Sequence, residues 1–152
     1  MARPNRYLLG PQLLLGLCGK EPRAVQWAAT VQESECVLSR LAIAIVRSVI
    51  NNGSRTEVQR QDWHQALSAT VSRMEGGGAT LVDVNETVLE RFHEYRTHAP
   101  LDFRTPRGSA PLAQDVRLLI TTAAVMDLVY AEYTDLYMQQ LQTGTNVRVL
   151  AL

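Results

Sequence analysis

Five short apolar runs, separated from one another by stretches with helical character, constrain the fold of this chain most. They cover residues 6–9, 35–38, 79–82, 128–131 and 147–150. Strands that alternate with helices in this way form a parallel sheet with helices on both faces. With 152 residues and neither an internal repeat nor a candidate linker, the chain is expected to form one domain, 1–152. Ligands of such sheets bind beyond the carboxyl ends of the strands.

The segments between these runs predict helices and one long connection. Helices are expected over residues 12–18, 22–32, 40–50, 56–74, 85–97, 112–126 and 134–142. The helix over 40–50 is apolar nearly all round, which is typical of a helix that is deeply buried or shared with a partner. Residues 98–111 contain Pro100, Pro106, Gly108 and Pro111, and this composition predicts a loop.

Charge excludes one class of function. Fifteen basic residues balance fifteen acidic ones, so the net charge is zero. A protein that binds nucleic acid mainly by neutralising phosphates across its whole surface would be strongly basic. A local patch remains open, and Phe103, Arg104 and Arg107 form a small aromatic and basic cluster. Arg104 and Arg107 are therefore candidate nucleic-acid contacts, with a solvated loop as the alternative.

The N-terminal segment imitates a signal peptide, because basic residues precede a mostly apolar stretch. Gly10, Pro11 and Gln12 interrupt that stretch, and no small-residue cleavage site follows it. No run of eighteen or more apolar residues is present to span a membrane. We expect a soluble, cytoplasmic protein without a membrane partner, whose Cys18 and Cys36 are buried free thiols.

Familiar catalytic motifs are absent from the sequence. It contains no dinucleotide-binding or phosphate-loop glycine pattern and no serine nucleophile elbow. His93 and His98 are five residues apart, whereas a zinc helix needs two histidines four apart on one face.

Several segments together resemble one known family. They are Arg6-Tyr7-Leu8-Leu9, the apolar Leu13-Leu14-Leu15, the run from Leu38 to Val46, the segment from Pro111 to Ala124, and Leu128-Val129-Tyr130-Ala131. In order and spacing they are similar to the PIN domain, and within it to the VapC-like ribonuclease toxins of bacterial toxin–antitoxin pairs. The resemblance implies a three-layer α/β/α sandwich with a five-stranded, mainly parallel sheet. It also implies a homodimer and an antitoxin-like protein partner.

The acidic positions of that family are only partly kept. PIN nucleases gather about four carboxylates to hold Mg²⁺ or Mn²⁺, which activates water for attack on a phosphodiester. The first acid is replaced by Gly10, within Gly10-Pro11-Gln12, and the second by Ile45. Asp115 matches the third, unless the register places Val116 there, and Glu132 lies near the fourth. Asp115 and Glu132 are the candidate metal ligands, Asp135 is a weaker one, and no residue is assigned a catalytic role.

These losses lead to competing hypotheses. The leading one is a PIN-like protein that has lost metal-dependent ribonuclease activity, needs no cofactor, and binds a protein partner or RNA. The alternative is an active Mg²⁺- or Mn²⁺-dependent endoribonuclease with a rearranged site formed by Asp115, Glu132 and Asp135 or Asp83. A third possibility is a structural subunit that uses neither Asp115 nor Glu132.

Overall fold

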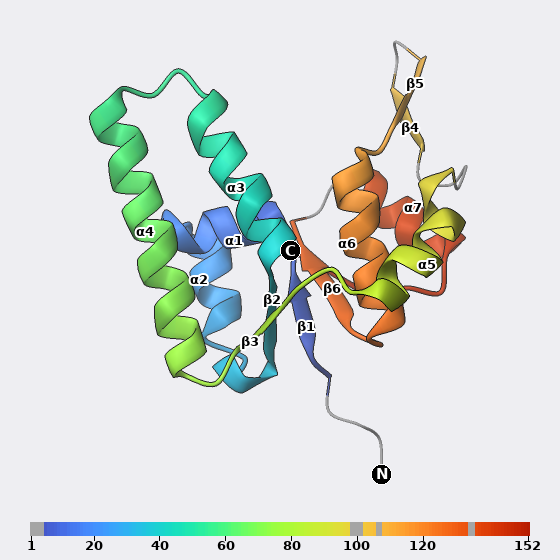
Figure 1. Ribbon diagram of the computed structural model, residues 1–152, viewed down its shortest axis with the longest axis horizontal. Helices are drawn as coiled ribbons and strands as arrows, with labels where there is room; N and C mark the ends of the chain where they lie inside the picture. The colour runs from blue at the N-terminus through green and yellow to red at the C-terminus, as the bar shows by residue number, and fades with distance from the viewer. Residues whose placement is uncertain (1–4, 98–101, 106–107, 134–135) are drawn as a thin grey trace.

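Strands and helices alternate along the chain as the sequence predicts (Figure 1). The computed structural model describes residues 5–97, 102–105, 108–133 and 136–152. Its elements are β1 (Tyr7–Leu9), α1 (Pro11–Cys18), α2 (Pro22–Ala28), the 3-10 turn η1 (Glu33–Glu35), β2 (Cys36–Ser39), α3 (Arg40–Asn52), α4 (Glu57–Gly76), β3 (Thr80–Val82), α5 (Glu86–Arg96), β4 (Asp102–Thr105), β5 (Gly108–Pro111), α6 (Gln114–Val125), β6 (Val129–Glu132), α7 (Leu136–Gly144) and β7 (Val149–Ala151).

The main sheet has five strands in the order β3-β2-β1-β6-β7, and every neighbouring pair is parallel. From β1 the chain first builds outward through β2 and β3, and later returns to add β6 and β7 on the other side of β1. The strand order therefore reverses between β1 and β6. Ligands of parallel sheets bind at such a reversal. A ligand site is therefore expected at the carboxyl ends of β1 and β6.

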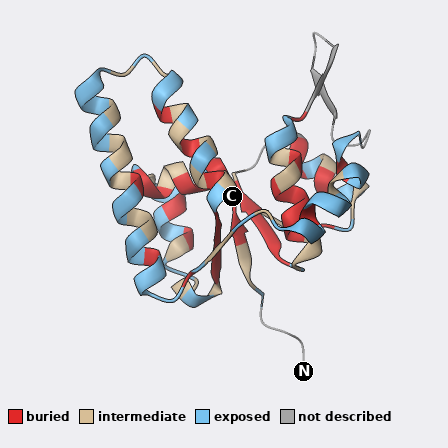
Figure 2. Ribbon diagram, in the orientation of Figure 1, coloured by how far each residue is buried: buried red, intermediate tan, exposed pale blue. Residues whose placement is uncertain are grey.

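Each face of the sheet is covered by its own hydrophobic core. Leu8 and Leu9 are both fully buried, yet they belong to different clusters, because successive side chains of a strand point to opposite faces. One cluster packs against α1 to α4, and the other against α5 to α7 and the start of α3, including Ala42 (Figure 1). Figure 2 shows the buried residues concentrated on the strands and on the helix faces that meet them. The predicted three-layer α/β/α fold is confirmed.

Local signals explain where the long helices begin and end. The Ser39 hydroxyl accepts a hydrogen bond from the Leu41 N–H (3.1 Å) and caps α3. Thr56 and Gln59 form a reciprocal capping box at the start of α4. After α4, Gly78 has a φ of +106°, a conformation that glycine adopts without steric cost. These signals are local in sequence, so they can be recognised without the fold.

The prediction of a loop over residues 98–111 is wrong for residues 102–105 and 108–111, the part of this segment that the structure describes. Within this segment β4 and β5 form an antiparallel two-stranded sheet, in which Arg104 lies opposite Ser109 and Asp102 opposite Pro111. Proline is tolerated in edge strands, and both strands of a two-stranded sheet are edges. Pro111 is therefore compatible with its place in β5, and Pro100 and Pro106 lie outside the described residues.

Two further expectations concern Cys18, Cys36 and the membrane. Both cysteines are free and buried, as predicted. Burial raises the pKa of the Cys18 thiol and raises that of Cys36 to about 11. Among the described residues, no helix combines the length and the apolar character needed to cross a bilayer.

Candidate functional site

The candidate site lies where β1 and β6 end side by side. Gly10 directly follows β1, and its N–H donates to the Ala131 carbonyl of β6 (2.7 Å). Pro11 then begins α1, where its fixed φ suits a first helical position. Glu132 is the last residue of β6. The first and fourth acidic positions inferred from the sequence, Gly10 and Glu132, are therefore neighbours in space.

The carboxylate of Glu132 is bonded to backbone amides. Its Oε1 accepts hydrogen bonds from the N–H groups of Leu13 (2.7 Å) and Tyr133 (2.8 Å). Its Oε2 accepts from the N–H of Gln12 (3.0 Å). Two of these donors belong to the first turn of α1, whose amides lack partners within the helix. Glu132 of β6 therefore caps the first turn of α1, and this residue is only 2% exposed.

Gly10 and Glu132 are sterically matched. A Cβ atom added at residue 10 would overlap Glu132 Oε2 and lie 2.6 Å from Glu132 Cδ. No side chain at position 10 is compatible with this conformation of Glu132. Gly10 and Glu132 consequently form one packed unit, in which a carboxylate from β6 occupies the space beside the end of β1.

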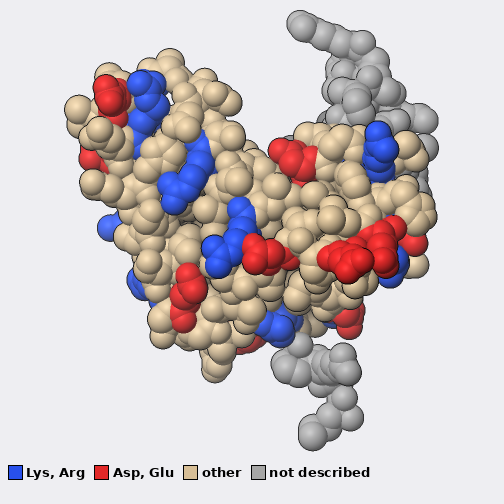
Figure 3. All heavy atoms as spheres, viewed as in Figure 1, with Lys and Arg blue, Asp and Glu red and all other residues tan. Residues whose placement is uncertain are grey.

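Asp115 lies at the rim of an open cleft of about 660 Å³ between α3 and the start of α6. Its Oδ1 accepts a hydrogen bond from the N–H of Val116 (2.8 Å) and its side chain is exposed. Val116 instead packs against the core, so Asp115 is the residue of this pair that faces solvent. Figure 3 shows the hollow between the α3 and α6 sides, with acidic and basic side chains on both.

Apolar side chains line the α3 wall of this cleft. Ile45, which the sequence resemblance aligns with the second acid, is half-buried there together with Leu41 and Val49. Arg55 is the basic residue of the wall, and its guanidinium donates to the Val49 carbonyl (3.3 Å). Glu132 does not line the cleft. Asp115 is thus exposed at the cleft, whereas Glu132 is buried against the start of α1.

The remaining candidate acids are Asp83 and Asp135. Asp83 pairs with Arg40 on the surface (3.0 Å), and Asp135 lies outside the described residues. Across the described part of the chain, no three His, Cys, Asp or Glu side chains are grouped so that they could hold a metal ion. Of the candidate nucleic-acid contacts, Arg104 lies in β4 and Arg107 lies outside the described residues.

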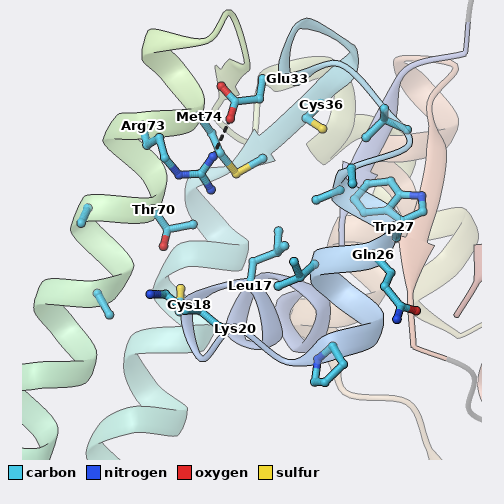
Figure 4. A pocket seen from close by; sticks show the side chains of 17 residues that line it. Leu17, Cys18, Lys20, Gln26, Trp27, Glu33, Cys36, Thr70, Arg73 and Met74 are labelled. Atoms are coloured by element: carbon cyan, nitrogen blue, oxygen red, sulfur yellow. Dashed lines mark hydrogen bonds and ion pairs between the residues drawn. The ribbon is translucent and has the colours of Figure 1, made fainter.

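A second hollow was not anticipated from the sequence. It is a cavity of about 920 Å³ between α1, α2 and α4, closed on one side by Cys36 of β2 (Figure 4). Its lining is mostly apolar and includes Leu17, Trp27 and Met74. At one end Arg73 pairs with Glu33, as the dashed line in Figure 4 marks.

Small residues form two of the cavity's walls. Ala28 and Ala29 line it from α2 and the residue that follows it, and Ala66 and Ala69 line it from α4. Val25 of α2 also lines the cavity and is 45% exposed. These alanines and Val25 are the residues in the sequence that indicate the cavity. They can be recognised as its walls only when α2 and α4 are known to face each other.

Comparisons with known proteins place the fold. Neither a protein-family model nor a curated protein matches the sequence. Solved structures do match over nearly the whole chain. FitAcB from Neisseria gonorrhoeae is 17% identical with a TM-score of 0.67, and the match covers 95% of this chain and 96% of that one.

Two further solved structures agree with this result. VapBC2 from Rickettsia felis, solved bound to a DNA fragment of its promoter, is 10% identical with a TM-score of 0.65, over 95% and 97% of the two chains. VapC20 from Mycobacterium tuberculosis, described as a toxin that cleaves the sarcin–ricin loop, is 10% identical with a TM-score of 0.60, over 88% and 93%. The chain therefore has the PIN-domain fold of VapC-like toxins, as the sequence resemblance implies.

Proposed function

We propose that this protein, which has the fold of the VapC-like toxins, lacks metal-dependent ribonuclease activity and acts by binding a protein partner. The observation that carries the proposal is the position of the Glu132 carboxylate in the space beside Gly10. That carboxylate accepts three backbone hydrogen bonds. Turning it toward a cation would strip the cap from α1 and leave buried N–H groups without acceptors, at about 1–3 kcal/mol each.

The chemistry of the remaining residues supports the same proposal. Mg²⁺ and Mn²⁺ require oxygen ligands that converge on one point. Ile45 offers none, and the exposed Asp115 carboxylate lies at the α3–α6 cleft, which Glu132 does not line. From the described residues, an active endoribonuclease would have to assemble its metal site with Asp115 and the RNA phosphates. A positioning error of even ~1 Å can lower a rate by about 10²-fold.

The partner surface that fits best is the cavity between α2 and α4. Its volume of about 920 Å³ and its apolar lining suit large apolar side chains. The alanines of both walls allow a helix backbone to approach closely. We infer that the partner inserts the apolar face of an amphipathic helix, a common mode of peptide recognition. Structures similar to this chain include a toxin–antitoxin complex from Klebsiella pneumoniae, and we propose an antitoxin-like partner here.

Two finer proposals concern the homodimer and RNA. The α3 face that lines the open cleft is apolar at Leu41, Ala44, Ile45 and Val49, and we propose that a second copy packs against it. Light scattering would give a dimer mass for the wild type and a monomer mass for Ile45→Glu. Binding of RNA through Arg104 and Arg107 stays a proposal that filter binding of Arg104→Ala/Arg107→Ala would test.

The ribonuclease assay with Mn²⁺ tests the loss of activity. We expect no cleavage of total RNA by the wild type beyond the level seen with a chelator. Cleavage that Asp115→Asn abolishes would contradict the proposal and favour the endoribonuclease.

Co-expression with a candidate antitoxin-like protein tests the partner surface. Ala69→Glu places a charge in the cavity wall, whereas Ser72→Glu places one on an exposed part of the same helix. We expect the wild type and Ser72→Glu to copurify with the partner and Ala69→Glu to lose it. Equal copurification of all three would place the partner elsewhere.

A further inference from the structure

Tyr133, the residue after β6, connects the sheet to the start of α2. Its hydroxyl donates a hydrogen bond to Glu21 Oε2 (2.7 Å). Glu21 is the N-cap of α2, and the same oxygen accepts a hydrogen bond from the Ala24 N–H (3.1 Å). The guanidinium of Arg23 lies over the Tyr133 ring, 4.7 Å from its centroid. One aromatic side chain thus contacts the cap and the first turn of α2.

Gly16 shows how closely α1 approaches the same side chain. A Cβ atom added at residue 16 would overlap the Tyr133 hydroxyl and lie 2.9 Å from Tyr133 Cζ. It would also lie 3.3 Å from the Ala24 Cβ of α2. Glycine in the middle of a helix costs about 1 kcal/mol relative to alanine. Here it creates the space in which the Tyr133 ring lies between α1 and α2.

The neighbouring residue holds α1 itself, since Glu132 caps its first turn. Two consecutive residues at the end of β6 therefore fix the two helices that supply Leu17 and Val25 to the large cavity. We propose that Tyr133 is a positioning residue that holds α2 against α1 and thereby sets the width of this cavity. That this width governs partner binding rests on the proposed function.

Electrostatics supports the strength of the contact. The hydrogen bond from Tyr133 is the main cause that lowers the pKa of Glu21 to about 2. Burial and the same bond raise the pKa of Tyr133. The donor therefore stays protonated and the acceptor charged over the whole physiological range, and hydrogen bonds to charged acceptors are the stronger kind.

Cys18 and Cys36 are built-in reporters of the cavity width, because both line it (Figure 4). The experiment measures the rate at which each thiol reacts with an aromatic disulfide reagent at pH 8. Tyr133→Phe keeps the ring and removes the hydroxyl. Tyr137→Phe is the matched control, because its hydroxyl lies 3.5 Å from that of Tyr130 in the core on the other face of the sheet.

We expect Tyr133→Phe to accelerate both reactions by about tenfold, the effect of losing one charged hydrogen bond that holds α2 closed. Tyr137→Phe should leave both rates within about twofold of the wild type under the same conditions. Glu21→Gln removes the charge from the acceptor and should reproduce Tyr133→Phe. Rates that stay unchanged in both Tyr133→Phe and Glu21→Gln, even if stability falls, would overturn the proposal. Since no partner takes part in the measurement, its result is independent of the copurification test.

Discussion

Replacing Glu132 with glutamine tests the cap on α1 with the smallest possible change. The amide carbonyl can take the place of Oε1 and still accept from the N–H groups of Leu13 and Tyr133. The amide NH₂ then replaces Oε2 and faces the N–H of Gln12, so that two donors oppose each other. If the amide is flipped, its NH₂ takes the place of Oε1 instead, and the two hydrogen bonds from Leu13 and Tyr133 are lost rather than the one from Gln12.

The expected cost follows from these contacts. Losing a hydrogen bond to a charged acceptor costs about 1.5–3 kcal/mol, and the two remaining bonds weaken because their acceptor is neutral. We expect the free energy of unfolding to fall by about 2–4 kcal/mol. For a domain of this size that corresponds to a decrease in Tm of about 5–15 °C.

Urea unfolding measures this change, and Glu94→Gln provides the control. Glu94 pairs with Arg91 on the surface (3.1 Å), so its loss should cost less than about 1 kcal/mol. If Glu132 were instead a metal ligand beside other carboxylates, Glu132→Gln would increase the free energy of unfolding of the metal-free protein. Removing the charge would relieve the repulsion between these carboxylates. An unchanged or increased stability of Glu132→Gln would therefore refute the cap.

Three further predictions concern Gly10, Glu21 and Cys36. Gly10→Asp should destabilise the protein by more than about 3 kcal/mol, and less in a Glu132→Ala background, with a coupling above about 1 kcal/mol in a double-mutant cycle. The pKa of Glu21 is lowered to about 2, so the stability that its charged form contributes is present above pH ~4.5 and is lost as the pH falls toward 2. Urea unfolding at several pH values should show this loss of stability in the wild type and a smaller loss in Tyr133→Phe. Because burial raises the pKa of Cys36 to about 11, mass spectrometry should find its alkylation at pH 8 far slower than that of a free cysteine, and equal rates would contradict the burial.

The sequence predicts the sheet and most helices well, because their signals are local. Apolar runs of three or four residues mark strands, and residues such as Ser39 and Thr56 mark where helices begin. The order of these elements places Gly10 and Glu132 at neighbouring strand ends, where the structure also places them.

The role of Glu132 is not local in sequence. Its carboxylate reaches amides about 120 residues away in the chain, so no pattern around position 132 separates a helix cap from a metal ligand. The cap is indicated instead by Gly10, which is the N-cap residue of α1 and has no side chain to accept a hydrogen bond. The first amides of such a helix need an acceptor from another part of the chain. The cavity was missed for a related reason, since its walls come from α2 and α4, whose facing surfaces are set by the fold.

Calorimetric titration of the wild type with Mn²⁺ tests the central claim most directly, with Asp115→Asn and Glu132→Gln measured alongside. If the carboxylate of Glu132 caps α1 and no metal site remains, the wild type and both variants give only the heat of dilution. Saturable binding of Mn²⁺ by the wild type that Glu132→Gln abolishes would show that Glu132 is a metal ligand after all, and would contradict the loss of the metal site.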